Sequence, residues 1–217
     1  DNKDIVIDTA LPAAVSVTSP NDNATYKIGD FTNYQVTFNE AVTVTGTPQL
    51  KLETGNTDAL SFYIGGSGTT VLTFSWTVAE GHASNDLDYS GTDALILNNG
   101  TINNAVGNAA VLTLPEPGNN NSLGANKALV IDGVLPTVAS VTSTTSNGTL
   151  KVGDVAAITV TFSEAVTVNT SSGFPQLTLE TGSADAVVNY SSGSGGTTLT
   201  FNYTVASGHA SSDLDYA

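Results

Sequence analysis

The stretch ALVIDGVLPT, at Ala128–Thr137, decides the fold because the chain contains it twice. The matching stretch, DIVIDTALPA, lies at Asp4–Ala13 and aligns Asp8 with Asp132 at an offset of 124 residues. In both copies a short apolar run typical of a β-strand ends at an aspartate and continues into a segment with proline. We therefore expect two copies of one module, with this stretch at the joint between them.

The repetition continues downstream of this stretch. TFNEAVTV and TFSEAVTV align Glu40 with Glu164 at the same offset, whereas VAEGHASNDLDY and VASGHASSDLDY align at an offset of 127 residues. The three additional residues of the second copy lie around positions 169–173. An insertion between matched strands indicates a surface loop.

The alignment divides the chain into three parts. We expect residues 1–8 to be the terminal strand of a preceding repeat and residues 9–132 to be one complete repeat. Residues 133–217 are expected to be a second repeat without its last strands, because nothing in it matches residues 90–126. We interpret the sequence as an internal segment of a longer protein.

The composition argues against several classes of function. The 217 residues include 20 acidic and five basic side chains, for a net charge of −15, so the surface repels phosphate backbones and anionic lipids. We expect no nucleic-acid partner and no direct membrane insertion, since no apolar run approaches the length of a membrane span. Cysteine is absent, so the modules need a source of rigidity other than disulfides.

Short alternating apolar runs, separated by Gly, Asn, Asp and Pro, predict β-strands along the whole chain. One run places Tyr34, Val36 and Phe38 on the same strand face, and the second copy is apolar at all three positions. Later strands are expected at residues 93–98 and 110–115. About seven strands per module predict an all-β fold of tandem immunoglobulin-like antiparallel β-sandwiches joined by a short Asp/Gly/Pro linker. An up-and-down barrel is the alternative.

Acidic residues are expected to gather where two modules meet. If each strand runs opposite to the strand before it, the loops alternate between the two ends of the module. Followed along the chain, this alternation places four oxygen-bearing side chains at the end that leads into the next module: Asp86, Asp88, Asn104 and Asp132. Glu164 is expected at the facing end of that next module. Oxygen ligands without Cys or His suit calcium, and gathered carboxylates are costly unless a cation neutralises them. We therefore expect calcium as a cofactor at the joint.

The same residues also have a simpler interpretation. Asp and Asn favour turns through local hydrogen bonds, so these carboxylates can be scattered turn residues. Their recurrence at fixed positions, while neighbouring residues differ between the copies, favours the metal site. Asp86 and Asp88, within the DLDY motif, are the strongest candidates.

The succession VTFSEAVTV, PQLTLETG, SGSGGTTLTFNYTVASGHASSDLDY and ANKALVIDGVLPTV resembles the tandem immunoglobulin-like, cadherin-like repeats of very large bacterial surface adhesins, including the calcium-dependent type secreted with RTX tails. The resemblance covers nearly the whole chain. It implies an extracellular cell-surface spacer that calcium rigidifies between neighbouring repeats of the same chain. In such adhesins this spacer holds a ligand-binding tip, for a glycan or a surface receptor, away from the cell.

The resemblance also implies particular metal ligands. The acidic residue of the family's F[ST]E motif corresponds to Glu40 and Glu164, and Asp8 corresponds to Asp132 by the internal repeat. The family's DLD pair corresponds to four aspartates, namely Asp86, Asp88, Asp213 and Asp215. The family often has aspartate in a DAAGN loop where this chain has NNAVGN. The chain would therefore offer only the neutral oxygens of residues such as Asn104 at that place.

Two other interpretations remain open. In the first, the β-sandwich is itself a carbohydrate- or receptor-binding module; Trp76 and the tyrosines could form a sugar platform, but alternation predicts Trp76 in the core. In the second, the chain is a subunit of an extracellular filament, in which DNKDIVID at residues 1–8 completes the sheet of a neighbour.

An enzymatic function is not expected. The repeated GHAS motif places His82 beside Ser84 and Asp86, but no nucleophile elbow or oxyanion loop surrounds them. Glu40, Glu53 and Glu80 with Asp58 could offer a glycosidase carboxylate pair, but carboxylates in turns are common and nothing places two of them across a cleft.

Overall fold

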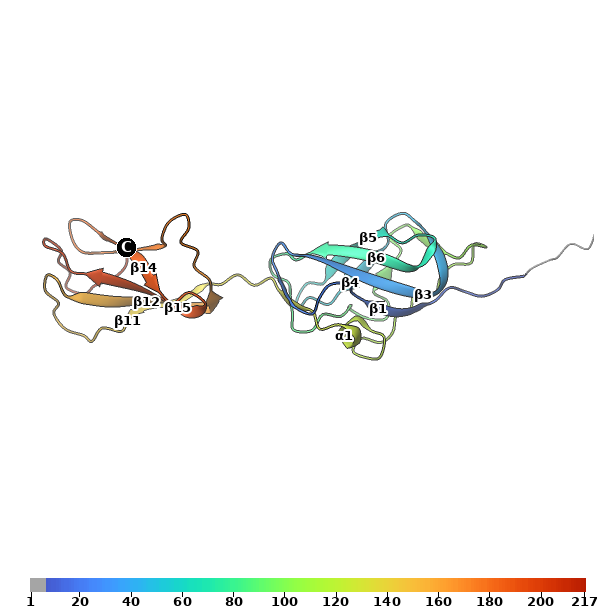
Figure 1. Ribbon diagram of the computed structural model, residues 1–217, viewed down its shortest axis with the longest axis horizontal. Helices are drawn as coiled ribbons and strands as arrows, with labels where there is room; N and C mark the ends of the chain where they lie inside the picture. Colours follow the sequence, from blue (N-terminus) through green and yellow to red (C-terminus); the bar gives the residue numbers. More distant parts are fainter. Residues whose placement is uncertain (1–6) are drawn as a thin grey trace, which may run out of the picture. The chain divides into compact units, whose positions relative to one another are not determined.

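The computed structural model describes residues 7–217 and divides the chain into two compact units (Figure 1). Unit 1 extends to Val134 and unit 2 comprises Leu135–Ala217, so the boundary lies within the ALVIDGVLPT stretch. Almost all regular structure in the described residues is β-strand, in curled and mostly antiparallel sheets. The predicted all-β, sandwich-like fold is therefore confirmed.

Unit 1 is built from two sheets. The large sheet has the order β1-β3-β6-β5-β4-β8, with β9 paired to the second half of β3, and the small sheet has the order β2-β10-β7. The strands are β1 (Ala14–Thr18), β2 (Thr25–Lys27), β3 (Phe31–Thr45), β4 (Gln49–Leu52), β5 (Ala59–Gly65), β6 (Thr69–Thr77), β7 (Ala83–Ser84), β8 (Leu95–Ile96), β9 (Thr101–Asn103) and β10 (Val130–Asp132).

Strand β3 is the longest strand of unit 1 and joins its two ends. Its first half alternates buried and half-buried residues, as the sequence pattern predicts, and pairs with β6 from Phe31 to Thr37. The pairing is then interrupted and resumes at Val42, which is typical of a β-bulge. The second half of β3 pairs with β9 instead. Asn39 and Glu40 lie in the interruption.

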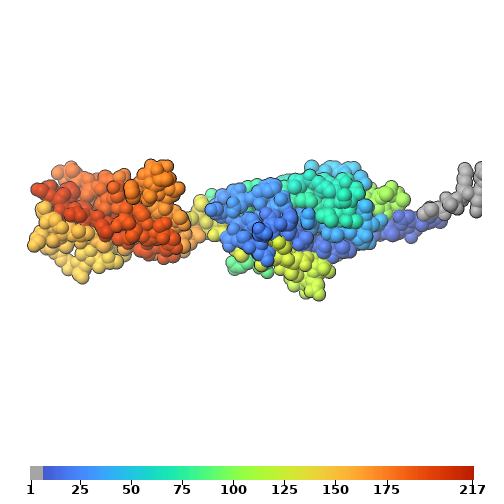
Figure 2. All heavy atoms as spheres, in the orientation of Figure 1, coloured from blue at the N-terminus to red at the C-terminus, as the bar shows by residue number. Residues whose placement is uncertain are grey.

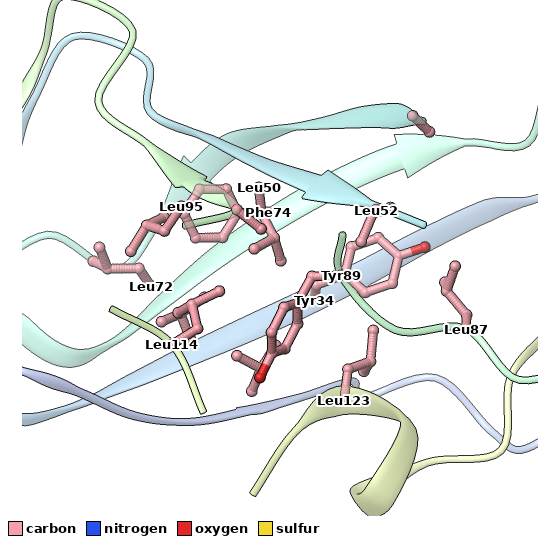
Figure 3. Packing of buried hydrophobic residues seen from close by; sticks show 14 of the residues in the cluster. Tyr34, Leu50, Leu52, Leu72, Phe74, Leu87, Tyr89, Leu95, Leu114 and Leu123 are labelled. Carbon is pink, nitrogen blue, oxygen red and sulfur yellow. The ribbon is translucent and has the colours of Figure 1, made fainter. Parts of the chain in front are cut away.

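The core of unit 1 lies between the sheets and the segments that cross them (Figure 3). Tyr34 and Phe74, from neighbouring strands, are completely buried, and Leu52 and Leu87 are buried with them. Burying each such side chain stabilises the fold by about 1.5–3 kcal/mol. The strand positions predicted to face inward are therefore the positions that hold the sheets together.

A segment that the sequence analysis leaves unassigned closes one side of this core. It contains α1 (Leu123–Asn126), a single helical turn whose cap residue, Ser122, accepts a hydrogen bond from the backbone of Ala125. Leu123 points from α1 into the core (Figure 3). The Asn126 side chain donates to the carbonyl of Val17 in β1. Figure 2 shows this segment, in yellow-green, against the blue strands of unit 1.

The strand expected at residues 110–115 does not form. Only an isolated bridge joins Val111 to Ala13, and the expected strand at residues 93–98 shortens to the two residues of β8. The reason lies in the backbone hydrogen bonds, because the N–H groups of Ala110, Val111 and Leu114 are donated to three different segments. An alternating sequence pattern predicts which side chains are buried, but not that one partner strand accepts all of their N–H groups.

Unit 2 repeats the large sheet of unit 1. Its strands follow the order β11-β12-β15-β14-β13 and have the bounds β11 (Val138–Ser143), β12 (Val155–Val166), β13 (Gln176–Leu179), β14 (Ala186–Ser192) and β15 (Gly196–Thr204). The pairing of β12 with β15 is interrupted between Thr161 and Val166, as β3 is at the equivalent place. A separate apolar core lies behind this sheet.

No helix in residues 7–217 is long and apolar enough to cross a membrane.

Candidate functional site

The N-terminal segment of unit 1 is attached by side-chain amides. Asn108 Nδ2 donates to the carbonyls of Asp8 and Ala10, at 3.2 and 3.0 Å. Asn39 accepts from the N–H of Ala13 through its side chain, at 2.8 Å, and donates its own N–H back to Ala13. We define the leading end of unit 1 as Asp8–Ala13, Asn39–Glu40 and Asn104–Asn108.

Glu40 places an unusual atom at the leading end. Its side chain is half-buried, and its Oε1 atom is buried without a hydrogen-bond partner. The aligned residue of the second repeat, Glu164, has the same unpartnered oxygen. Residues 7–217 contain one other such side-chain atom, Oδ1 of Asn33. A buried carboxylate oxygen without a partner is costly, and here it occurs at the aligned residue of both repeats.

Asn104 lies at the leading end, and this corrects its expected position beside Asp132. Asn104 is buried, its Nδ2 donates to the carbonyl of Ala10, and its Oδ1 accepts the N–H groups of Val106 and Asn108. The expectation fails because β9, which leads directly into Asn104, pairs with the second half of β3. Both lone pairs of the Asn104 side-chain oxygen are already used within the loop.

Asp88 is engaged in a structural role at a different place. Its Oδ2 accepts the N–H of Gly118 at 3.0 Å, and its Oδ1 accepts those of Tyr89 and Leu123 at 2.9 and 3.2 Å. This half-buried carboxylate therefore ties the segment that contains α1 to the sheet. Burial, together with the nearby carboxylates of Asp88 and Glu116, raises the pKa of the Tyr89 phenol above its usual range.

Asp132 marks the opposite end of unit 1, which we name the trailing end and define as Lys27–Asp30, Val78–His82 and Asp132–Gly133. Asp132 pairs with Lys27 in β2, and the N–H of Gly133 donates to the carbonyl of His82 at 2.8 Å. The carboxylate accepts the N–H of Val134, as the carboxylate of Asp8 accepts that of Ala10. The two aligned aspartates therefore form the same local turn.

The predicted carboxylates of unit 1 are not gathered in one place. The backbone of Leu129, three residues before Asp132, pairs with Leu87, so Asp88 lies about 10 Å or more along the sheet from the trailing end. Asp86 lies between them and is exposed. In the part of the chain that the structure describes, no three His, Asp or Glu side chains are clustered closely enough to hold a metal ion.

The candidate residues of unit 2 reproduce part of this arrangement. Ser163 takes the place of Asn39: its side chain accepts the N–H of Thr137 at 3.0 Å, and Glu164 follows it. Asp215 accepts the N–H of Tyr216 at 2.8 Å, as Asp88 accepts that of Tyr89. Asp213 is exposed, like Asp86.

Three features of these ends were not predicted from the sequence. Asn39 and Asn108 hold the N-terminal segment, and His82 pairs through Nδ1 with the hydroxyl of Thr54, at 2.8 Å, while its ring packs edge-on against Trp76. Trp76 is half-buried and packs against the core. The aligned His209 pairs instead with the hydroxyl of Tyr203. Asparagine beside a strand end is the only sequence signal for the first two residues, and it is too common to be selective.

Together these features define an all-β, sandwich-like protein with a recurring unpartnered carboxylate at one end of each unit. Comparison with known proteins finds no family model that matches the chain and no curated protein similar to it.

Proposed function

We propose that this chain is a non-enzymatic extender segment of a bacterial cell-surface adhesin, in which calcium bound between neighbouring repeats makes the joint rigid. The proposal follows the sequence resemblance and assigns the protein to the extracellular surface. Its partners are neighbouring repeats, while a glycan or receptor is bound by other domains of the parent protein.

The observation that carries the proposal is the unpartnered Oε1 atom of Glu40 and of Glu164. The two residues are aligned by the repeat, and each follows a side chain that holds the segment leading into its unit. A turn residue with only a local role would have its buried oxygen satisfied by nearby N–H groups, as the oxygens of Asp88 are. A calcium ion would supply the missing partner without a proton.

The proposed ligands come from two modules, as the resemblance to tandem adhesin repeats implies. In this proposal Glu164 and Asp132 contribute to the joint within the chain, and Glu40 and Asp8 to the equivalent joint with a preceding repeat. Asp86, with its counterpart Asp213, is exposed and free to add an oxygen. Asp88 and Asn104 would have to give up existing hydrogen bonds to bind the ion, so we propose that they contribute less to the metal site than the other residues.

Calorimetry with calcium and with chelator tests the proposal. Calcium at a hundred times its dissociation constant is expected to stabilise the folded chain by about 2.7 kcal/mol. Glu164→Gln, which keeps the shape and removes the charge, should abolish most of this gain. The matched control is Glu53→Gln, which removes the same charge from an exposed residue after β4 and should leave the gain unchanged. An equal melting temperature in calcium and chelator would refute calcium binding.

Small-angle scattering separates an extender from a simple calcium-binding domain. If calcium fixes the joint, the distribution of molecular lengths in solution should be narrow with calcium and broad with chelator. Glu164→Gln should give the broad distribution under both conditions. Identical profiles with and without calcium would leave the metal bound but remove its mechanical role.

A carbohydrate- or receptor-binding module is the second candidate, and one observation favours it. The outer face of β5 exposes Leu60, Phe62 and Ile64, with Phe62 51% exposed. In the second repeat the aligned residues are Val187, Asn189 and Ser191, so only unit 1 has three apolar residues in a row on this face. Binding of the chain to a glycan array that Phe62→Ala abolishes would establish this function, and an array without binding would count against it.

A further inference from the structure

Unit 2 has a hollow of about 620 Å³ where two neighbouring strands of its sheet separate. Residues 185–191, in and just before β14, line one side, and residues 202–204 of β15 line the other, together with His209. Most of these residues are polar or present backbone groups. We call this hollow the strand-gap hollow.

The register of β14 and β15 shows where the hollow begins. The two strands pair from Ser192 opposite Thr200 to Tyr190 opposite Phe201, and within residues 135–217 the pairing stops there. Continued by one more residue, it would place Asn189 opposite Asn202. In unit 1 the aligned strands do form this next pair. The hollow therefore opens at the two asparagines, which lie on facing strands.

Backbone groups of both strands point into the hollow. The N–H of Tyr190 donates to the carbonyl of Pro175, on the β13 side, and the N–H of Val205 donates to the residue before β12. Successive residues of a strand direct their N–H and C=O groups to opposite edges. The backbone groups of Asn189 and Thr204, which precede these two residues, therefore face the gap between the strands.

Neighbouring side chains orient the two asparagines. Gln176 Nε2 donates to Asn189 Oδ1 at 2.9 Å, and Asn202 Nδ2 donates to Ser191 Oγ at 3.0 Å. Within the described residues, Asn189 Nδ2 and Asn202 Oδ1 make no other hydrogen bond. The hollow thus has an oriented amide donor on one strand and an oriented carbonyl acceptor on the facing strand.

Two aromatic rings also line the hollow. The rings of Tyr203 and His209 are nearly parallel, at 11°, with their centroids 6.0 Å apart, and Tyr203 Oη lies 2.9 Å from His209 Nδ1. Tyr203 is buried and His209 is half-buried. A flat ring beside an oriented donor and acceptor suits a ligand with an apolar face and a hydroxylated edge, which is the chemistry of a saccharide.

The hollow is a property of the strands themselves. In unit 1 the strands β8 and β9, from the part without a match in unit 2, pair with β4 and β3 and not with β5 or β6. The outward positions of β5 are Leu60, Phe62 and Ile64, which are exposed like their counterparts in β14. The surface beside the strand gap is thus open in both repeats, but it is apolar in unit 1 and mostly polar in unit 2.

We propose that the strand-gap hollow binds a neutral saccharide that carries neighbouring hydroxyl groups. Asn189 Nδ2 donates to the oxygen of one hydroxyl group, Asn202 Oδ1 accepts from the next, and a C–H face of the sugar ring packs on His209. Anionic sugars are disfavoured, because Asp185 lines the hollow and residues 135–217 contain six carboxylates against one lysine. The site needs no calcium and is distinct from the apolar face of β5.

NMR titration of the full chain in chelator tests this inference. The probes are the methyl glycosides of glucose, galactose and mannose, with the methyl glycoside of sialic acid as the anionic comparison. At least one neutral glycoside should shift the side-chain amide signals of Asn189 and Asn202 and the ring signals of His209. The anionic glycoside should shift them less at every concentration.

Asn189→Asp is the decisive variant, because aspartate keeps the oxygen that accepts from Gln176 and loses the free amide donor. It should weaken binding of the neutral glycoside by about tenfold. Asn169→Asp is the matched control. It makes the same change at another exposed asparagine of unit 2 and keeps the oxygen that accepts the N–H of Ser171, so it should leave binding unchanged.

Several results would overturn the proposal. One is the absence of shifts with every neutral glycoside, and another is equal weakening by Asn189→Asp and Asn169→Asp, which would indicate a general effect of charge. Binding of a peptide of alternating threonine and valine, but of no glycoside, would instead indicate strand addition in the gap. Phe62→Ala, in unit 1, should not affect glycoside binding at the hollow, so this site is tested apart from the face of β5 and from the calcium site.

Discussion

At the scale of single residues, the aligned carboxylates of Asp88 and Asp215 differ in the number of backbone N–H groups that they accept. Asp88 accepts three backbone N–H groups and holds the segment around α1, whereas Asp215 accepts one, from Tyr216. The motif DLDY is the same in both, so the difference depends on which distant segment reaches the carboxylate.

Asp88→Ala is expected to destabilise unit 1 by about 1.5–3 kcal/mol, because hydrogen bonds from backbone N–H groups to a charged acceptor are lost. The aligned variant, Asp215→Ala, should cost unit 2 less than about 1 kcal/mol, since only a local hydrogen bond is removed. Denaturant unfolding of the two variants in chelator measures both values. Equal losses would show that the contacts of Asp88 with Gly118 and Leu123 contribute little.

Gly133 is the residue of the joint stretch that tolerates least change. Its backbone passes so close to the carbonyls of Ala79 and His82 that a methyl group has no room. Gly133→Ala should destabilise unit 1 by about 1–3 kcal/mol. Gly65→Ala, where nothing lies within 4 Å of the added atom, serves as the control in the same thermal melts. Equal melting temperatures for the two variants would contradict the close approach.

Tyr34 makes unit 1 sensitive to alkaline pH. Its burial raises the pKa of the phenol, and the hydrogen bond with Thr32 only partly offsets this. Because the folded-state pKa is raised, the associated stability is complete below the unfolded-state value of about 10 and is lost as the pH rises above it. Unit 1 should therefore lose stability progressively above pH of about 10. Tyr34→Phe should weaken this dependence in urea titrations followed by tryptophan fluorescence, and the raised pKa of Tyr89 should preserve the rest.

At the scale of elements, the alternation of apolar and polar residues predicts which side chains face inward, but it does not predict which strands pair with each other. Tyr34, Val36 and Phe38 are buried as their spacing predicts, because a pleated strand on a core allows no other register. The ends of unit 1 are different. A bulge at Asn39–Glu40 and the short strands β8 and β9 change which end each loop reaches, and no local pattern encodes those changes. Asn104 was misplaced for this reason.

Asn104 organises the loop after β9, and its removal tests that loop. Asn104→Ala leaves the N–H groups of Val106 and Asn108 without their acceptor and should destabilise unit 1 by about 1–3 kcal/mol. Hydrogen exchange should increase at residues 106–108 and at Ala10 while β6 stays protected. An unchanged exchange pattern around Ala10 would mean that Asn108 and Asn39 hold the N-terminal segment without Asn104.

At the scale of the whole molecule, the two repeats have the same sheet but differ in how completely their cores are enclosed. Val36 is fully buried in unit 1, whereas the aligned Val160 is 7% exposed, and Tyr89 is buried where Tyr216 is exposed. The sequence alignment predicts the shared sheet, since the strands match one for one. It also accounts for the difference in enclosure, because Leu123 and other core residues of unit 1 lie in residues 90–126, which have no match within residues 133–217.

This difference predicts two unfolding transitions, with unit 2 melting first. The aligned core residues Leu72 and Leu199 assign each transition to a unit. Leu199→Ala should lower the melting temperature of the first transition only, and Leu72→Ala that of the second only. Each substitution should reduce the free energy of unfolding of its own unit by about 2–5 kcal/mol. Differential scanning calorimetry in chelator makes the measurement, because calcium across a joint would couple the units. A single transition that both variants shift equally would show that the units unfold as one.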